Sequence, residues 1–526
     1  MDGKGKIAKA AGKMSIATLI SRILGYVKDM ILAFYFGATG VSDAFFAAFR
    51  IPNLLRELFA EGSMSAAFIP VLTEHRHAEG EAAAKRLVKI TFSFILLAAG
   101  SICLLGIFFA PGIVALITPG FLDQPEQFTL TVLLTRIMFP FLLFISLAAL
   151  VMGALNTKRV FFIPALAPAM LNVTIITTIV LFVTRFEKPV IAVALGVAIG
   201  GFVQFAFQLP SFYKKNYRLG FVPAFRHPAL RKMAVLLIPA TLALAVNQIY
   251  IIVSTILASY LPLGSITYLY YSMRLIQFPI GIFGAAMAMS VLPALSEHAV
   301  KGDFDKLRED FSFALRLLFF LSVPAMAGLI ALREPIVNLL FQRGTFDYFA
   351  TKATAEALLF FSLGIWATCG VKIVTVTFYS MQDTKTPVKI AAVGVASNLL
   401  LSLALMGPLK HSGLALAYAL AASLNFTLLF YFLRKKLQHI EARRIIKAFL
   451  KTLIASLIMG ISGWALLHGD IWERGGQSLN KAIYLLGTIT LCILIYIVVS
   501  YFLRNEEMKH LFEMLKNKIY GKRAEQ

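Results

Sequence analysis

Basic side chains inside apolar segments are the residues of this sequence best suited to do chemistry. Nine of its 50 lysines and arginines interrupt long apolar segments, and four of the nine lie near the start: Arg22, Lys28, Arg50 and Arg56. Arg274 follows 224 residues after Arg50. A charge at membrane depth is costly and usually faces a partner or a water-filled cavity. Since the planar fork of arginine matches phosphate oxygens, these residues predict a cationic cavity for an anionic ligand.

Carboxylates accompany these cations in the first two apolar segments. On a helix, Arg22 would share a face with Asp29, and Arg50 with Glu57. Two interpretations stay open for the acidic residues, which could serve the cavity or only pair with basic neighbours and hold helices together. They are Asp29, Asp43, Glu57 and Glu61. Three further intramembrane cations are expected to make structural pairs or to reach toward the membrane surface: Arg316, Lys372 and Lys451.

Motifs for enzymatic chemistry are absent from the sequence. It contains no P-loop, no H-E-x-x-H and no G-x-S-x-G. Its three cysteines, Cys103, Cys369 and Cys492, lie far apart in apolar segments and are expected to be buried thiols. We therefore expect no enzyme, no metal site and no bound cofactor.

The composition places these residues in a membrane protein. The chain of 526 residues is 59% hydrophobic and only 15% charged, which excludes a soluble enzyme, a disordered chain and a disulfide scaffold. Because about 20 apolar residues cross the hydrocarbon core, its apolar segments predict 14 transmembrane helices in an all-α polytopic fold. The predicted spans are 15–37, 44–71, 90–117, 130–154, 161–183, 190–212, 233–258, 267–295, 311–332, 354–380, 387–406, 413–433, 448–467 and 482–502.

Basic residues in the connecting segments orient these spans. With the N-terminus inside, 33 lysines and arginines fall in cytoplasmic segments and 8 on the opposite side. This asymmetry predicts that both termini are cytoplasmic. It also accounts for most of the net charge of +23 without nucleic acid as a partner. Arg22, Lys28 and Asp29 interrupt the first apolar segment, which indicates an uncleaved first helix rather than a signal peptide.

An internal repeat relates the two halves of the chain. Residues 63–75 (SMSAAFIPVLTEH) resemble residues 286–298 (AMAMSVLPALSEH) at an offset of 223. The offset corresponds to six helices, an even number, so the halves should be related by a pseudo-twofold axis along the membrane normal. We predict a first six-helix lobe, a second six-helix lobe, two additional helices and a cytoplasmic tail. Their ranges are 1–220, 221–440, 441–503 and 504–526.

Three stretches resemble the MurJ/MviN family, the lipid II flippases of the multidrug/oligosaccharidyl-lipid/polysaccharide exporter superfamily. They are SRILGYVKDMILAFYFGATGVSDAFFAAFRIPNLLRELFAEGSMSAAFIPVL at 21–72, YSMRLIQFPIGIFG at 271–284 and FYSMQDTKTPVK at 378–389. The similarity covers nearly the whole chain.

The resemblance implies two lobes around a central cationic cavity, and a groove for a polyprenyl tail formed with the last two helices. It implies that residues essential for flipping are Arg22, Asp43, Arg56 and Arg274. We expect Asp43 to orient a partner or the pentapeptide headgroup of lipid II. Lys28 stands where many relatives have arginine. Arg50 occupies a position that is basic in the family and can be lysine. Gln277 replaces an acidic residue found in some relatives, so no carboxylate function carries over there.

The hypothesis is that this cavity accepts the diphosphate and sugar headgroup of lipid II at the cytoplasmic face of the bacterial inner membrane. It then opens to the periplasm by alternating access of the two repeats. The coupling could use membrane potential, Na+ or H+. Asn247 and Asp383 are the polar candidates for ion coupling, although a helix–helix hydrogen bond and a helix cap are the ordinary interpretations.

Other functions stay open at this point. One is an exporter of another polyprenyl-linked oligosaccharide or of a drug, although a basic cavity suits a cationic drug poorly. A function of another class is a scaffold for cell-wall synthesis or division proteins. The tail carries Met508, Leu511, Phe512 and Leu515 on one helical face, so it could lie on the inner leaflet or be solvated.

Overall fold

Helices, and no strands, form the regular structure of the residues described by this computed structural model. The described residues are 3–57, 63–476, 478–510 and 513. For 3–11, 13, 63–66, 239–240 and 242–247, only the backbone is described. The chain divides into two compact units, residues 1–267 and 268–526. All three cysteines are buried and free, as predicted.

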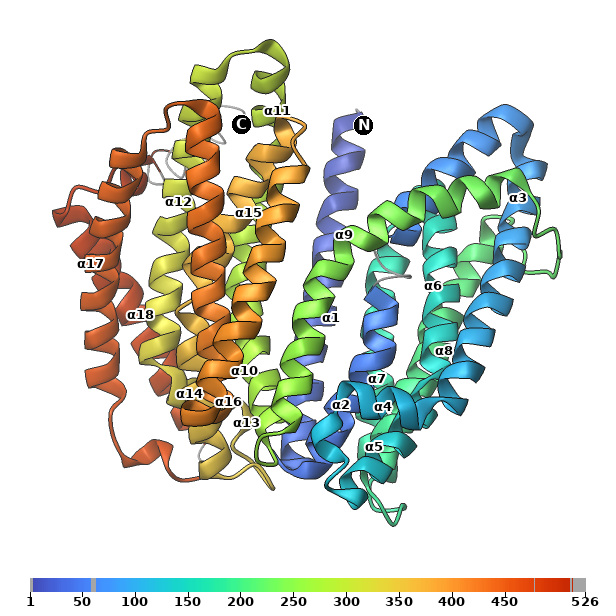
Figure 1. The fold of residues 1–526 in the computed structure, drawn as a ribbon, viewed down its shortest axis with the longest axis horizontal. Helices are drawn as coiled ribbons and strands as arrows, with labels where there is room; N and C mark the ends of the chain where they lie inside the picture. Colours follow the sequence, from blue (N-terminus) through green and yellow to red (C-terminus); the bar gives the residue numbers. More distant parts are fainter. Residues whose placement is uncertain (1–2, 58–62, 477, 511–512, 514–526) are drawn as a thin grey trace. The chain divides into compact units, whose positions relative to one another are not determined.

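The first unit consists of long helices packed against one another (Figure 1). Helix α8 lies against α7 and α6, α1 lies against α7, and α9 lies against α3. Gly196 and Gly200, one turn apart on α8, face α7, where a Cβ atom at Gly196 would come within 2.2 Å of the Thr178 hydroxyl. Such a spacing lets membrane helices approach closely. The helices of this unit are α1 (Gly3–Phe36), α2 (Gly40–Arg56), α3 (Ser63–Phe108), α4 (Ala110–Ile117), α5 (Pro125–Met138), α6 (Pro140–Thr157), α7 (Phe162–Phe182), α8 (Val190–Lys214) and α9 (Pro228–Ser259).

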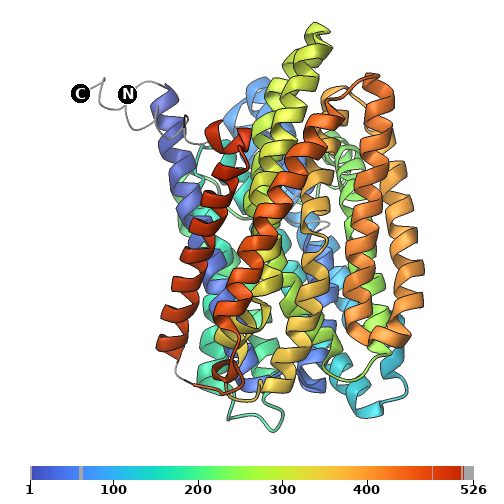
Figure 2. The same ribbon diagram turned by 90° about the vertical axis from the view of Figure 1, so that its left-hand side faces the viewer.

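The second unit is arranged around α12, which packs against α15 and α17. Helices α17 and α18 form a hairpin and run side by side (Figure 2). Helix α10 begins at the end of the first unit and continues into the second. The helices are α10 (Ser265–Pro279), α11 (Ala286–Lys301), α12 (Phe304–Ala331), α13 (Arg333–Phe341), α14 (Tyr348–Ser362), α15 (Ile365–Ser380), α16 (Lys385–Leu437), α17 (Ala442–Leu467) and α18 (Ser478–Phe502).

Ten helical segments among the described residues are long and apolar enough to cross a membrane. The longest, α16, has a non-helical residue at Lys410 and covers two predicted spans, 387–406 and 413–433. The polytopic all-α fold is therefore confirmed. The count of 14 stays a prediction, because several spans are joined in one helical segment or include residues outside the described part.

The backbone breaks of the two halves recur at the offset found in the sequence. Residues with left-handed φ end or interrupt helices at equivalent positions: Gly80 (a break inside α3) and Gly302, Arg159 and Gln382, and Asn216 and Gln438. Each pair is 222 or 223 residues apart. A left-handed residue is a common way to end a helix, so the halves share helix ends as well as sequence.

π-Helical conformation occurs at equivalent positions of the two halves. Residues Ile280–Ala285 form a π-helix directly after Pro279. Glu57, 223 residues before Ile280, also has π-helical conformation and is the last described residue before 58–62. Such turns interrupt regular helix hydrogen bonding and often mark functional sites. Both follow the basic residues identified from the sequence, Arg50 and Arg56 in one half and Arg274 in the other.

The boundary between compact units differs from the predicted lobe boundary at residue 220. Helix α9 packs against α3, so the contacts divide the chain between Thr267 and Tyr268. This division concerns packing, whereas the lobes were defined by sequence repetition. The two-lobe organisation and the pseudo-twofold axis stay predictions.

The helix end at Gly302 can be tested by adding a methyl group. Gly302 has φ 71°, and no atom lies within 4 Å of a Cβ atom built there, so Gly302→Ala acts through the backbone alone. The left-handed conformation should cost alanine about 1 kcal/mol. The matched control is Gly100→Ala inside α3, which also has open space and should stabilise by about 0.5 kcal/mol. Thermal unfolding in detergent should therefore shift down for Gly302→Ala but not for Gly100→Ala. Equal shifts would contradict this assignment.

Candidate functional site

Helix α1 carries the first predicted site residues. Arg22 is exposed, whereas Lys28 and Asp29 are buried and their charged atoms lie 2.9 Å apart. Asn172 of α7 donates a hydrogen bond to the Ser21 carbonyl at 3.3 Å, which fixes α1 beside Arg22. The structure therefore pairs Lys28 locally and leaves the Arg22 side chain accessible.

The end of α2 joins charged and amide side chains. Arg56 donates from Nε to Asn53 Oδ1 at 3.1 Å, and its guanidinium lies 3.6 Å from Glu57. Glu57 accepts from the Asn53 amide at 3.0 Å and also from the Gln248 amide of α9. This cluster orients Arg56 and links α2 to α9. Two of the acidic residues therefore pair with basic neighbours: Asp29 with Lys28, and Glu57 with Arg56. Glu61 lies outside the described residues.

Asp43 makes a different kind of contact from the one proposed for a headgroup ligand. Its side chain is buried, with 2% of the residue exposed. One carboxylate oxygen accepts from the Gly264 amide at 2.6 Å, and the other from the Thr267 amide at 2.8 Å and hydroxyl at 2.6 Å. Asp43 therefore holds the turn that begins α10, and both of its oxygens are occupied by protein donors.

The remaining basic site residues lie on two helices. Arg50 is half-buried on α2, two turns before Glu57. Arg274 is half-buried on α10 in the second unit, six residues before the π-helical turn. Exposed Gln277 follows it on the same helix. The structure brings Arg50 and Arg56 onto one helix, while the convergence of both with Arg274 stays a prediction.

The two candidates for ion coupling have different outcomes. Asn247 lies on α9, but its side chain is outside the described part of the chain. Asp383 accepts from the Thr386 amide at 3.0 Å and lies 2.6 Å from Lys436 Nζ. Burial raises the pKa of Asp383, but hydrogen bonds from Lys436 and Thr386 outweigh it and lower the pKa to about 2. The carboxylate is thus an ionised helix cap, which is the ordinary interpretation of this position.

Two partners in this region were missed from the sequence. Gln248 is adjacent to Asn247, so an intramembrane amide pair was the available signal. Thr267 follows Gly264 and Ser265, a pattern typical of a helix start. Their partners Glu57 and Asp43 lie about 190 and 220 residues earlier, and a single sequence contains no signal for contacts at that separation.

A comparison with known proteins identifies the family. A family model described as lipid II flippase MurJ matches residues 32–477. The chain belongs to this family. A relative from Burkholderia cenocepacia, named lipid II flippase MurJ, is 36% identical over 91% of this chain and 94% of its own length. A relative from Vibrio cholerae, named probable lipid II flippase MurJ, is 35% identical over 94% and 95%, respectively.

Solved structures agree with the family assignment. A lipid II flippase MurJ in an inward closed conformation matches with a TM-score of 0.76 and 27% identity, covering 93% of this chain and 98% of its own. An inward-facing multidrug resistance MATE family transporter of the MOP superfamily matches with a TM-score of 0.67 and 13% identity, covering 82% and 98%. The second similarity shows the shared fold alone. The chain is a multi-pass membrane protein of the MurJ family.

The hydrogen bonds of Asp43 generate a test. Asp43→Ala would leave two buried amides without their acceptors, and each loss typically costs about 1–3 kcal/mol. We expect a lower thermal unfolding midpoint for Asp43→Ala and a smaller decrease for Asp43→Asn, which keeps one acceptor oxygen. Thr267→Val is the matched control, because it removes only the hydroxyl donor. A normal midpoint for Asp43→Ala would show that the carboxylate does not stabilise this turn.

Proposed function

We propose that this protein moves lipid II across the bacterial inner membrane, from the cytoplasmic to the periplasmic leaflet. The observation that carries the proposal is membership of the lipid II flippase family over nearly the whole chain. The basic residues of α1, α2 and α10 supply the matching chemistry, because lipid II carries a diphosphate. The polyprenyl tail stays in lipid while the headgroup crosses.

The physical difficulty is the headgroup. A diphosphate with sugars and a peptide cannot enter hydrocarbon without losing its hydration, at a high cost in free energy. Arginine donors can replace part of that hydration and match two phosphate oxygens at once. Arg22, Arg56 and Arg274 are the proposed diphosphate contacts. Arg50 and Lys28 add to the positive field.

The position of Asp43 changes its proposed contribution. Its oxygens accept from the turn that begins α10, the helix that carries Arg274. Asp43 therefore supports the site by fixing the start of this helix, rather than by binding the pentapeptide of lipid II. Asn53 and Glu57 orient Arg56 in a similar way.

The orientation follows from charge. The 33 basic residues assigned to cytoplasmic segments, against 8 opposite, support cytoplasmic termini in the inner membrane. No cofactor is proposed. Partners besides lipid II are membrane lipids and proteins of cell-wall synthesis or division. A scaffold for such proteins and an exporter of another polyprenyl-linked oligosaccharide are the alternatives that the experiments below can support.

Substitution of Arg274 is the most direct test of the proposed headgroup site. Removing a charge-assisted hydrogen bond typically costs about 1.5–3 kcal/mol, which corresponds to roughly tenfold or more in rate. Arg274→Ala should therefore slow lipid II flipping in vesicles by at least about tenfold, and Arg274→Lys by less. Arg136→Ala is the matched control, because Arg136 is an exposed arginine on α5 that donates to the Ile107 carbonyl.

Each alternative has its own outcome in that experiment. Full lipid II flipping by folded Arg274→Ala protein would remove the headgroup site from the proposal. A scaffold would tolerate both Arg274 substitutions in a growth complementation assay. An exporter of another oligosaccharide would move a different polyprenyl-linked substrate faster than lipid II.

The driving force is proposed to be the membrane potential acting on the charged cavity. One elementary charge moving across 100 mV exchanges about 2.3 kcal/mol with the field. The occupied carboxylate of Asp383 favours this source over an ion site at that position. Flipping in vesicles should change with an imposed potential at equal sodium and pH on both sides. Dependence on a sodium or proton gradient at zero potential would instead indicate ion coupling.

A further inference from the structure

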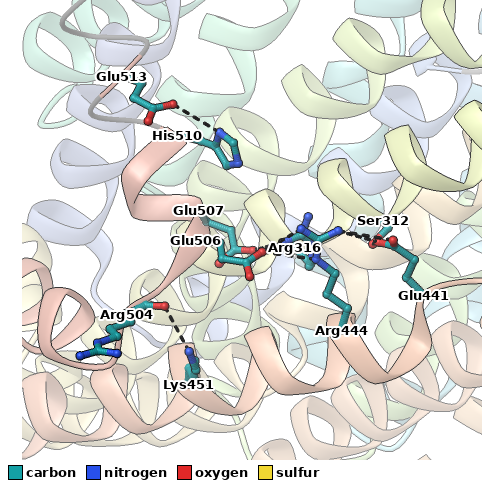
Figure 3. Close-up of polar contacts among 10 residues, drawn as sticks. All are labelled: Ser312, Arg316, Glu441, Arg444, Lys451, Arg504, Glu506, Glu507, His510 and Glu513. Atoms are coloured by element: carbon teal, nitrogen blue, oxygen red, sulfur yellow. Dashed lines mark hydrogen bonds and ion pairs between the residues drawn. The ribbon is translucent and has the colours of Figure 1, made fainter.

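The chain turns back after its last long helix. Arg504 has a left-handed φ of 51°, and the Asn505 amide donates to the Ser500 carbonyl at 3.1 Å. The next residues, Glu506 to His510, are helical. This turn directs the start of the tail toward α12 and α17 rather than away from the protein (Figure 3).

A buried ion pair holds the returning segment. Arg316 of α12 lies 2.5 Å from Glu507, and the two side chains are only 4% and 2% exposed. Glu506 lies 3.2 Å from Arg316 and 2.9 Å from Arg444 of α17, so it bridges two helices (Figure 3). Glu441 adds a hydrogen bond from the Ser312 hydroxyl at 2.6 Å. We call Arg316, Arg444, Glu506 and Glu507 the cytoplasmic clamp.

Apolar contacts accompany this clamp. Met508 joins a buried cluster with Phe320 of α12, Met459 of α17, and Cys492 and Tyr496 of α18. Tyr496 donates its hydroxyl to the Phe320 carbonyl at 2.7 Å. The segment therefore completes the core between three helices.

A second polar cluster lies at the other end of the hairpin. Lys481 of α18 is 2% exposed and donates to Asn338 Oδ1 of α13 at 3.1 Å and to the Arg474 carbonyl. The Asn338 amide in turn donates to the Trp472 carbonyl at 2.6 Å. Trp472 packs with Leu332, Leu467 and Leu485 in a buried cluster. We call Lys481, Asn338 and Trp472 the hairpin-loop clamp.

The two clamps restrict the hairpin more than apolar packing could. Lipid tails are as apolar as leucine, so apolar contacts alone allow membrane helices to separate at little cost. Separating Arg316 from Glu507 would instead leave uncompensated charges in a poorly solvated environment, which is strongly unfavourable. Lys481 would lose its acceptor on α13, Asn338, in the same way.

We infer that α17, α18 and the segment Arg504–Met508 form one rigid body with α12 and α13 throughout transport. The first part of the tail is thus a structural element, and the hairpin does not open from α12 to admit or release substrate. The transport consequence rests on the proposed function, whereas the rigidity of the hairpin does not.

A disulfide can lock the hairpin to α12 without touching either clamp. A Cβ atom built at Gly460 of α17 lies 3.7 Å from the Cβ of Ala327 on α12. This is close to the separation of about 3.8 Å in natural disulfides. Ala327→Cys with Gly460→Cys, in a chain with Cys103, Cys369 and Cys492 replaced by serine or alanine, would form this lock on oxidation.

The oxidised and reduced forms should flip lipid II at rates within about twofold of each other. Inhibition by the disulfide that a reductant reverses would overturn the inference. The reduced protein separates this result from the function itself, because absence of flipping in both forms would count against the proposed function.

Amide hydrogen exchange tests the cytoplasmic clamp without any transport measurement. In the full-length protein in vesicles, Glu507→Gln should accelerate exchange of the amides at 500–508 by at least about tenfold. Glu297→Gln is the matched control, because it breaks an ion pair with Lys301 whose side chains are 62% exposed. Unchanged exchange in Glu507→Gln would overturn the inference. If that variant fails to fold, the disulfide lock still decides the question.

Discussion

The cost of placing a charge in hydrocarbon organises this structure. An ionised side chain at membrane depth needs a partner, a hydrogen-bonding shell or water. Lys28 meets Asp29, Arg56 meets Asn53 and Glu57, and Arg316 meets two glutamates. Because Arg316 of α12 pairs with glutamates that follow α18, the same requirement that satisfies its charge also fixes a contact between distant elements.

The backbone responds to this requirement at repeated positions. Both halves have π-helical conformation at positions 223 residues apart, Glu57 and Ile280, shortly after their intramembrane arginines. A π-helical turn inserts a residue and redirects the side chains that follow. The repeat thus conserves an irregularity of the backbone together with the basic residues before it, which connects local helix geometry with the proposed site.

The sequence predicted the fold well because its signals are local. Long apolar segments and helix breakers give the spans, and the described residues of these spans are largely helical, while residues 58–62 of the span 44–71 lie outside the described part. The partners of charged residues were predicted less well. Asp43 was expected to orient a partner or the headgroup, but the turn at Gly264 and Thr267 was not predicted as its partner, and Gln248 was not identified at all. These contacts join residues that are distant in sequence, and nothing in the local pattern specifies them.

The tail shows the same limit most clearly. Its amphipathic pattern suggested a helix on the leaflet or in solvent, and Leu511, Phe512 and Leu515 of that pattern lie outside the described residues. Glu507 and Met508, in the described part, are buried against α12 and its neighbours. From the sequence alone, a glutamate in a basic tail is interpreted as a solvated residue. Its partner Arg316 lies about 190 residues earlier and is known only from the fold. Local pattern therefore predicts where charge must be satisfied, but only the fold selects the partner.

Two classes of intramembrane cation result from this selection. Arg316 pairs with Glu506 and Glu507, so its charge is satisfied only while the segment after α18 packs against α12. Arg22 is exposed, and solvent or a ligand can satisfy it in more than one conformation. A ligand shifts a conformational equilibrium only through different affinities for the two states. If the proposed function holds, enclosed pairs such as Arg316 with Glu507 maintain the rigid parts of the protein, and Arg22 is a position where a bound diphosphate would bias its movement.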